Sequence, residues 1–244
     1  MISNSEIKLI KSLSIKKFRD EHGLFAVEGE KMVEEALASS FEVVKVFRTE
    51  DIGEAAMSRI SAFKTPSPAL AVVRKPEDAG FKVGNGLCLA LDSIRDPGNL
   101  GTIIRIADWF GIKSVAVSAG TVDAFNPKTV QSTMGALFRV GIHCCDIVRA
   151  CKDVLSAGGK VYGTFLDGKD IYSQELPCDG EKPSMIVIGN ESEGISPAVE
   201  SVVSERLFIP PFPAGVQGSE SLNAAVAAGI AVAEFRRRER FRSV

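Results

Sequence analysis

Residues 86–111, GLCLALDSIRDPGNLGTIIRIADWFG, join a short apolar run to a turn sequence and then to a longer segment of helical composition. We predict a strand over 86–92 and a helix over 99–111, because the turn residues DPGN stand between them. Asn99 is predicted to cap this helix, since its side chain can accept a backbone hydrogen bond. A strand that leads through a tight turn into a helix is the building unit of an α/β fold.

The rest of the C-terminal two-thirds repeats this alternation. Further strands are predicted over residues 114–118, 139–144, 160–166, 184–189 and 206–211, and further helices over 127–138, 147–158, 196–204 and 221–240. Near-continuous apolar strands separated by helices indicate a mostly parallel sheet that is covered on both faces.

The N-terminal part carries a smaller α/β pattern. Helices are predicted over residues 7–13, 30–39 and 52–63, and strands over 24–29, 43–47 and 68–75. Residues 74–86, RKPEDAGFKVGNG, combine charge, one proline and three glycines with little apolar periodicity, which is typical of a linker. We therefore predict a domain of residues 1–76, a linker of residues 77–86 and a second domain of residues 87–244.

The composition is that of an ordinary globular protein, since the 244 residues are 45% hydrophobic and 25% charged, with a net charge of −2. No apolar stretch is long enough to span a membrane and the N-terminus lacks a secretion signal, so we expect a cytoplasmic protein. The net charge does not decide for or against nucleic-acid binding, because a local basic patch is what contacts phosphate. Five residues form either such a patch or a solvated helix face: Lys8, Lys11, Lys16, Lys17 and Arg19.

The five cysteines form no CxxC pair, and their number is odd, so a disulfide framework is not expected. His143, Cys144, Cys145 and Cys151 could be read as a zinc cluster. A buried strand end followed by a helix explains the same residues more simply, and we expect no metal site.

Three loops that leave predicted strands carry candidate functional residues, because ligands bind at the carboxyl ends of strands in such sheets. The segments are LDSIRDPGNLGTIIRIADWFG over 91–111, IVIGNESEGIS over 186–196 and IPPFPAGVQGSESLNAAVAAGIAVAEF over 209–235. The candidates within them are Asn99, Arg105, Gly189, Asn190, Glu191, Gly194, Ile209, Ser221, Leu222 and Asn223. Neither GxGxxG nor a GK[ST] ending is present, which argues against a dinucleotide or phosphate-loop site.

Each of these features also has a simpler explanation. Arg105 could be a surface arginine in an ion pair, and the segment that starts at Ser221 could be an ordinary capped helix of the core. The arginines of residues 236–240 could touch RNA, although cations at a helix C-terminus more often complement the helix dipole.

Taken together and in order, the three segments closely resemble motifs one, two and three of the SpoU (TrmH-like) family of SPOUT-class RNA 2′-O-ribose methyltransferases. The segment FNPKTVQSTMGALFRV, residues 125–140, resembles a further conserved stretch of that family. LFAVEGEKMVEEAL, residues 24–37, resembles the start of its substrate-binding N-terminal domain. The resemblance thus covers nearly the whole chain, but the loop between Ile209 and Ser221 is longer than the compact family form.

The resemblance implies a small N-terminal α/β/α RNA-binding domain and a C-terminal α/β domain with a trefoil knot that binds S-adenosylmethionine. It implies a homodimer and an RNA substrate, with ribosomal RNA favoured over tRNA. It assigns the cofactor pocket to Gly189, Asn190, Gly194, Ile209 and Leu222. It also assigns a catalytic role to Arg105, supported by Asn99, Glu191, Ser221 and Asn223.

Methyl transfer to a ribose oxygen also requires loss of the 2′-hydroxyl proton. The two histidines, His22 and His143, lie outside the three motifs, and arginine is a poor base. Arg105 could act through a bound RNA phosphate or by stabilising the developing alkoxide, and Glu191 is the other candidate base. Three other functions stay open: a catalytically silent RNA-binding protein, a tRNA 2′-O-methyltransferase and, remotely, an oxidoreductase.

Overall fold

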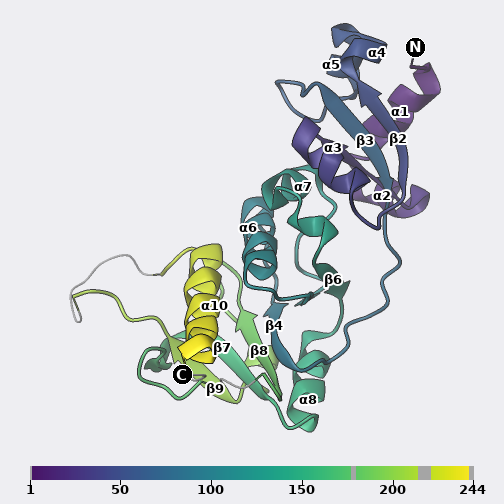
Figure 1. Ribbon diagram of the computed structural model, residues 1–244. Helices are drawn as coiled ribbons and strands as arrows, with labels where there is room; N and C mark the ends of the chain where they lie inside the picture. Colours follow the sequence, from purple (N-terminus) through teal and green to yellow (C-terminus); the bar gives the residue numbers. More distant parts are fainter. Residues whose placement is uncertain (1, 177–179, 214–220, 242–244) are drawn as a thin grey trace. The chain divides into compact units, whose positions relative to one another are not determined.

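The computed structural model describes residues 2–176, 180–213 and 221–241. The chain forms two compact units (Figure 1). The N-terminal unit consists of Met1–Glu77 together with Asp123–Arg139, and the C-terminal unit of Asp78–Val122 together with Val140–Val244. None of the described helices is long and apolar enough to cross a membrane.

The N-terminal unit contains a three-stranded antiparallel sheet in the order β1-β3-β2. Its strands are β1 (Leu24–Glu28), β2 (Val43–Arg48) and β3 (Ala69–Arg74), and its first helices are α1 (Asn4–Ser12), α2 (Lys16–His22), α3 (Glu30–Leu37), α4 (Thr49–Ile52) and α5 (Glu54–Ile60). Ser3 and Glu6 start α1 with a capping box, in which each side chain bonds the other residue's backbone N–H. Ile10, Leu13 and Leu70 are almost fully buried in the core that α1 shares with the sheet.

Segment 123–139 completes the N-terminal unit, although it lies far along the chain. It contains α7 (Pro127–Thr133) and a single 3₁₀ turn (Ala136–Phe138). The ring of Phe125 lies 4.9 Å from that of Phe25, and the ring of Phe138 lies 5.2 Å from that of Phe41. The pattern in residues 1–76 did not indicate that the unit needs this segment.

The predicted helix over 127–138 is wrong in its second half. α7 ends at Thr133 because Met134 and Gly135 both adopt left-handed backbone angles, with φ of 50° and 93°. A residue with positive φ stops an α-helix, and glycine takes this conformation without steric cost.

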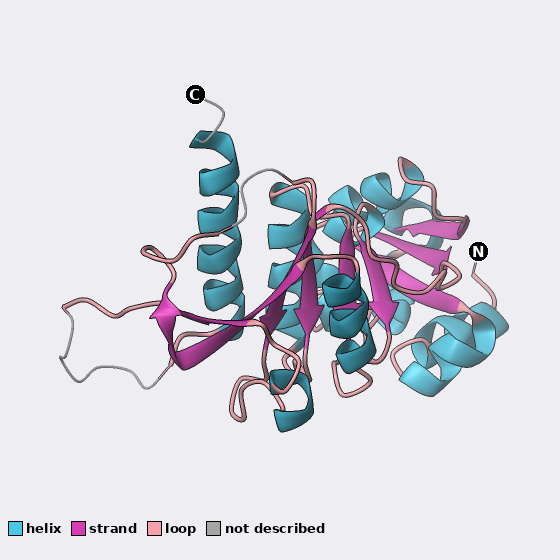
Figure 2. Ribbon diagram, turned by 90° about the horizontal axis from the view of Figure 1, so that it is seen from below, coloured by secondary structure: helices cyan, strands magenta, loops and turns pink. Residues whose placement is uncertain are grey.

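The C-terminal unit contains a six-stranded sheet in the order β6-β5-β4-β8-β7-β9, and every strand pairing in it is parallel. The strands are β4 (Gly86–Leu91), β5 (Ser114–Val117), β6 (Gly141–Cys144), β7 (Lys160–Asp170), β8 (Pro183–Ile188) and β9 (Glu205–Phe208). The helices are α6 (Pro97–Trp109), α8 (Ile147–Ser156), α9 (Pro197–Glu200) and α10 (Ala224–Phe241). Helices cover both faces (Figure 2), so the predicted mostly parallel, doubly covered sheet is confirmed.

The order of the strands marks a candidate binding site at the carboxyl ends of the two central strands, β4 and β8. The chain runs outward from β4 through β5 to β6 and then returns to the other side of β4, so β4 and β8 become neighbours. Leu91 and Ile188, the last residues of these two strands, pair with each other. Ligands bind where the strand order reverses, outside the carboxyl ends. The loops that follow β4 and β8 begin at this point.

Candidate active site

A chain of hydrogen bonds joins the three sequence segments. Glu191, in the loop after β8, accepts a hydrogen bond at Oε1 from Asn99 Nδ2 at 2.9 Å. The Oδ1 atom of Asn99 accepts one from Asn223 Nδ2 at 2.8 Å. Asn223 itself starts α10, because its Oδ1 accepts the backbone N–H groups of Ala225 and Val226. These hydrogen bonds hold the loop after β8 and the starts of α6 and α10 together.

Asp96, not Asn99, caps α6, so that prediction was wrong. The side chain of Asp96 accepts the backbone N–H of Asn99 at 2.8 Å, and Pro97 occupies the first helical position. Proline favours that position because its ring presets the helical φ and it lacks an N–H to satisfy. The cap is therefore the residue before the proline. Asn99 lies inside the first turn, 9% exposed, and its amide is available for Glu191 and Asn223.

Glu191 is held as a carboxylate by several donors. Besides Asn99, the backbone N–H groups of Arg95 and Asp96 donate to it, each at 3.2 Å. Burial alone raises the pKa of Glu191, but these hydrogen bonds outweigh it and hold the pKa below its usual range. A carboxylate that already accepts three hydrogen bonds is a weak proton acceptor, which argues for a positioning role.

The lowered pKa of Glu191 predicts a pH-dependent loss of stability. A carboxyl whose pKa is depressed in the folded state contributes stability above its ordinary pKa of about 4.5. That stability is lost as the pH falls through the folded value. We expect Glu191→Gln to unfold more easily than the unchanged protein near neutral pH, and the difference to shrink below about pH 4.5. Urea denaturation at a series of pH values measures this. Glu193→Gln is the control, because Glu193 is exposed in the same loop; an unchanging difference for Glu191→Gln would contradict the argument.

The loop after β8 is tightly folded. A Cβ atom on Gly189 would lie 2.3 Å from backbone atoms of Gly194 and Ile195, so only glycine fits. Asn190 and Gly194 exchange backbone hydrogen bonds of 2.9 and 3.0 Å. The buried amide of Asn190 donates to the Ser93 carbonyl at 2.7 Å and accepts two backbone N–H groups of its own loop. Asn190 therefore shapes the loop with its side chain.

The remaining predicted residues are not joined to this hydrogen-bond chain. Arg105 is exposed on α6 and has no hydrogen bond or ion pair with any described residue. Ile209 follows β9 and is half-buried, whereas Ser221 and Leu222 are exposed directly before α10, Leu222 to 48%. Residues 214–220, the central part of the loop between Ile209 and Ser221, lie outside the described residues.

Two residues next to the site were missed by the sequence analysis. Asp92, only 4% exposed, accepts the backbone N–H of Ser196 at 2.8 Å and so ties the loop after β8 to the end of β4. Ser93 has a φ of 62°, which is uncommon for a residue other than glycine, and its N–H donates to Ser118 Oγ at 2.8 Å. An aspartate directly after an apolar strand was a visible signal for the first, but no sequence pattern marked the second.

The region of the possible zinc cluster has another explanation. His143 Nδ1 lies 2.9 Å from Asp78 Oδ1, and Asp78 also accepts the Cys144 backbone N–H. Burial raises the thiol pKa of Cys145 to about 11 and that of Cys151 to about 12, which disfavours the thiolates that bind zinc. Within the described parts of the chain, no three His, Cys, Asp or Glu residues are grouped to hold a metal ion.

Comparison with known proteins shows to which protein family the chain belongs. The SpoU rRNA methylase family model matches residues 86–233, and the MRM3-like substrate binding domain model matches residues 4–72. The chain belongs to the SpoU rRNA methylase family.

Individual relatives extend this likeness over the full length. The chain is 34% identical to the 23S rRNA (guanosine(2553)-2′-O)-methyltransferase RlmP of Bacillus subtilis, with 96% of both chains covered. It is 29% identical to the mitochondrial rRNA methyltransferase 3 of Xenopus laevis, over 94% of this chain and 73% of the relative. A crystal structure of an AdoMet-bound rRNA methyltransferase from Sinorhizobium meliloti matches with a TM-score of 0.84 and 29% identity, covering 97% of this chain and 96% of that one.

Proposed function

We propose that this protein transfers a methyl group from S-adenosylmethionine (AdoMet) to a ribose 2′-hydroxyl of ribosomal RNA, in the cytoplasm. The observation that carries the proposal is the hydrogen-bonded set of Glu191, Asn99 and Asn223 at the central edge of the parallel sheet. Full-length likeness to an rRNA 2′-O-methyltransferase favours ribosomal RNA over tRNA.

The residues around the loop after β8 fit AdoMet. Gly189 allows the tight fold of the loop, and Gly194 has open space where a Cβ would stand, so a nucleoside can approach the backbone at Gly194. The backbone of Asn190 and the side chains of Ile209 and Leu222 complete the proposed pocket. AdoMet supplies the methyl group on a positively charged sulfonium. The trefoil knot of the chain path belongs to the same proposal.

Arg105 is proposed to act on the RNA side of the site. Its exposed guanidinium is unpaired among the described residues and can approach the ribose or a neighbouring phosphate. A fixed positive charge there stabilises the oxygen as it loses its proton. Glu191, Asn99 and Asn223 hold the start of α6, which carries Arg105, and the start of α10 in place. Ser221, exposed beside Asn223, offers a hydroxyl to the ribose.

The function is tested by mapping 2′-O-methyl groups in rRNA. A strain that lacks the protein should lose one or more such groups, and the purified protein with AdoMet should restore them on that rRNA. An unchanged rRNA methylation pattern together with new unmethylated positions in tRNA would instead indicate a tRNA enzyme.

The N-terminal unit is proposed to bind the RNA, with residues 1–76 as its main part. Lys8, Lys11 and Lys17 are exposed and can contact phosphates, with the salt dependence that such contacts bring. Arg19, the fifth residue of the possible basic patch, is only 1% exposed. It therefore cannot contact a phosphate. Lys16 is also engaged, in an ion pair with Asp20.

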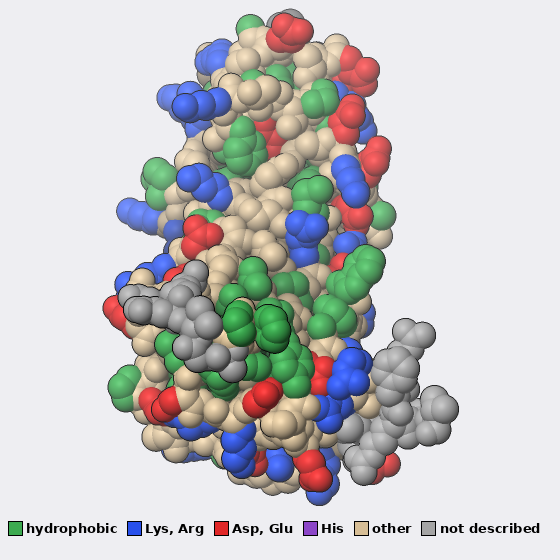
Figure 3. Space-filling view, turned by 90° about the vertical axis from the view of Figure 1, so that its left-hand side faces the viewer, with side chains coloured by type: hydrophobic (Ala, Val, Ile, Leu, Met, Phe, Trp, Pro, Cys, Tyr) green, Lys and Arg blue, Asp and Glu red, His purple; other side chains and the backbone are tan. Residues whose placement is uncertain are grey.

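A homodimer joined through the C-terminal unit is part of the proposal and predicts a mass twice that of the 26.1 kDa chain. Hydrophobic side chains gather over α10 on one face of this unit (Figure 3). Val226 on α10 is 49% exposed, and Trp109 on α6 is 85% exposed. Such exposed apolar surface marks interaction sites. Light scattering should find the dimer, and Val226→Glu should shift it toward monomer while Leu166→Glu, an exposed control on β7, should not. A monomer at micromolar concentration would refute it.

A further inference from the structure

The N-terminal unit contains a cavity of about 370 Å³ that no step of methyl transfer uses. It lies between α1, the sheet, the loop after α5 and α7, so segment 123–139 supplies one wall. Ile10, Leu70 and Val130 line it and are each at most 3% exposed, which makes its floor apolar. Its volume falls in the range of small-ligand pockets, about 300–1,000 Å³.

Three groups that line or border this cavity lack partners. The half-buried ring of Phe63 has no aromatic or cationic partner among the described residues. The Gln131 amide has no hydrogen bond to any residue that the structure describes, although it offers two donors and an acceptor. Lys11, exposed on the lining of the cavity, is likewise without an ion pair in the described chain. A flat ring, an amide and a cation are the groups with which proteins bind unstacked nucleotides.

Glu28 determines which part of a nucleotide can enter. Its carboxylate, 5% exposed, lines the cavity and accepts hydrogen bonds from Ser61 Oγ and from the backbone N–H groups of Ala62 and Ser67. A carboxylate has about four acceptor positions, so one is left for a ligand donor. Its negative charge disfavours a phosphate inside the cavity, whereas Lys11 favours one outside it.

We propose that this cavity binds one unstacked base of the RNA, and that it prefers bases with an exocyclic amino group. This rests on the proposed function, since it assumes an RNA substrate. The base stacks on Phe63, its amino group donates to Glu28 or to the Gln131 carbonyl, and its phosphate pairs with Lys11. Uracil lacks the amino donor and binds less well. The cavity therefore gives the N-terminal unit a preference for sequence as well as for charge.

The test uses the full-length protein and fluorescently labelled adenosine, cytidine and uridine hexanucleotides. Fluorescence anisotropy should show weaker binding of the uridine oligomer. Phe63→Ala should weaken binding of the adenosine and cytidine oligomers about 5- to 100-fold, which corresponds to the loss of one stacked base. Phe63→Tyr should keep the affinity, and Gln131→Leu should reduce the preference over uridine. Leu37→Ala, which truncates an exposed side chain on α3 away from the cavity, is the control.

AdoMet affinity and methylation of rRNA from the deletion strain are measured on the same proteins. If the unchanged protein methylates rRNA but binds the three oligomers equally, or if Phe63→Ala and Gln131→Leu bind as it does, the cavity is not a base site. If the unchanged protein methylates no RNA, the proposed function fails instead. Unaltered AdoMet affinity shows that the C-terminal unit is intact, and urea denaturation followed by circular dichroism shows whether the N-terminal unit of each variant is folded.

Discussion

Replacing Arg105 with alanine is expected to slow ribose methylation about a hundred- to a thousandfold, the usual cost of removing one group that stabilises transition-state charge. AdoMet affinity should stay nearly unchanged, because Arg105 makes no hydrogen bond or ion pair to the described parts of the loops after β8 and β9. Loss of a contact made only in the transition state lowers turnover without altering ground-state binding. Single-turnover methylation and calorimetric titration with AdoMet measure the two quantities separately.

Two further variants test whether the effect belongs to Arg105 and whether its charge causes it. Arg105→Lys keeps the charge but loses the planar fork, so an intermediate rate indicates that charge carries part of the effect. Arg149→Ala removes an exposed arginine from α8 and should methylate normally. Normal turnover in Arg105→Ala would exclude Arg105 from the mechanism and return Glu191 as the candidate base.

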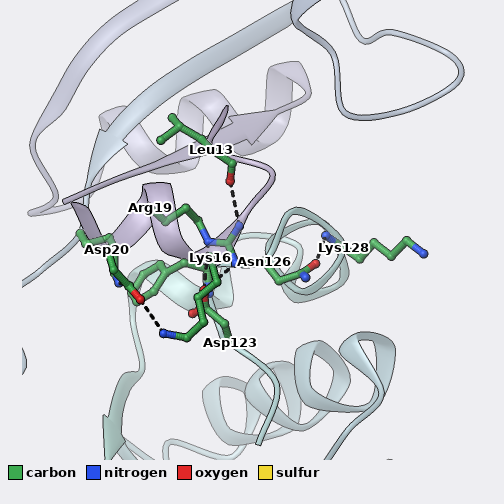
Figure 4. A network of polar contacts seen from close by, with 9 residues as sticks. Leu13, Lys16, Arg19, Asp20, Asp123, Asn126 and Lys128 are labelled. Carbon is green, nitrogen blue, oxygen red and sulfur yellow. Dashed lines mark hydrogen bonds and ion pairs between the residues drawn. The ribbon is translucent and has the colours of Figure 1, made fainter. Parts of the chain in front are cut away.

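Replacing Arg19 with alanine is expected to lower the free energy of unfolding by about 3–5 kcal/mol, because it leaves a largely buried carboxylate without its partner. Arg19 Nε and Nη2 both donate to Asp123 Oδ2, at 2.9 and 2.7 Å, and Nη1 donates to the Leu13 carbonyl at 2.8 Å (Figure 4). The Arg19 side chain is 2% exposed and that of Asp123 is 11% exposed. Urea denaturation followed by circular dichroism measures the loss.

The same helix provides a matched control. Lys16 pairs with Asp20, but these side chains are 66% and 43% exposed, so Lys16→Ala should cost less than about 1 kcal/mol. The double variant Arg19→Met with Asp123→Leu should recover much of the loss, because apolar residues of similar volume often replace a buried ion pair without penalty. Equal stability of the Arg19 and Lys16 variants would show that the buried pair does not hold segment 123–139 in place.

The sequence predicted the C-terminal sheet well because its strands are buried on both faces. All six residues of β8 are buried, so a continuous apolar run marked the strand. The three site loops were found for the same reason, since each begins where an apolar run stops. Glu191, Asn99 and Asn223 indeed come together, but their hydrogen bonds depend on the order of the strands, which no local pattern contains.

Other features could not be predicted from local patterns. Arg19 stands among lysines and looked like part of a phosphate patch, because its partner Asp123 is 104 residues away. The residue that caps α6, however, could have been predicted from the sequence. Asp96 and Asn99 are both good capping residues, and the rule that proline prefers the first helical position selects Asp96.

Segment 123–139 also determines when the N-terminal unit can finish folding during synthesis. The N-terminal unit cannot complete its core when residue 77 has been added, because Phe25 and Arg19 still lack Phe125 and Asp123. From residue 77 to residue 139 the ribosome must add 139 − 77 = 62 residues, which takes about 3–12 s at roughly 5–20 residues per second. During that interval the surface around Phe25 and Phe41, which segment 123–139 later covers, is open to chaperones and proteases. Slow translation between these positions should therefore lower the yield of folded protein more than slow translation after residue 139.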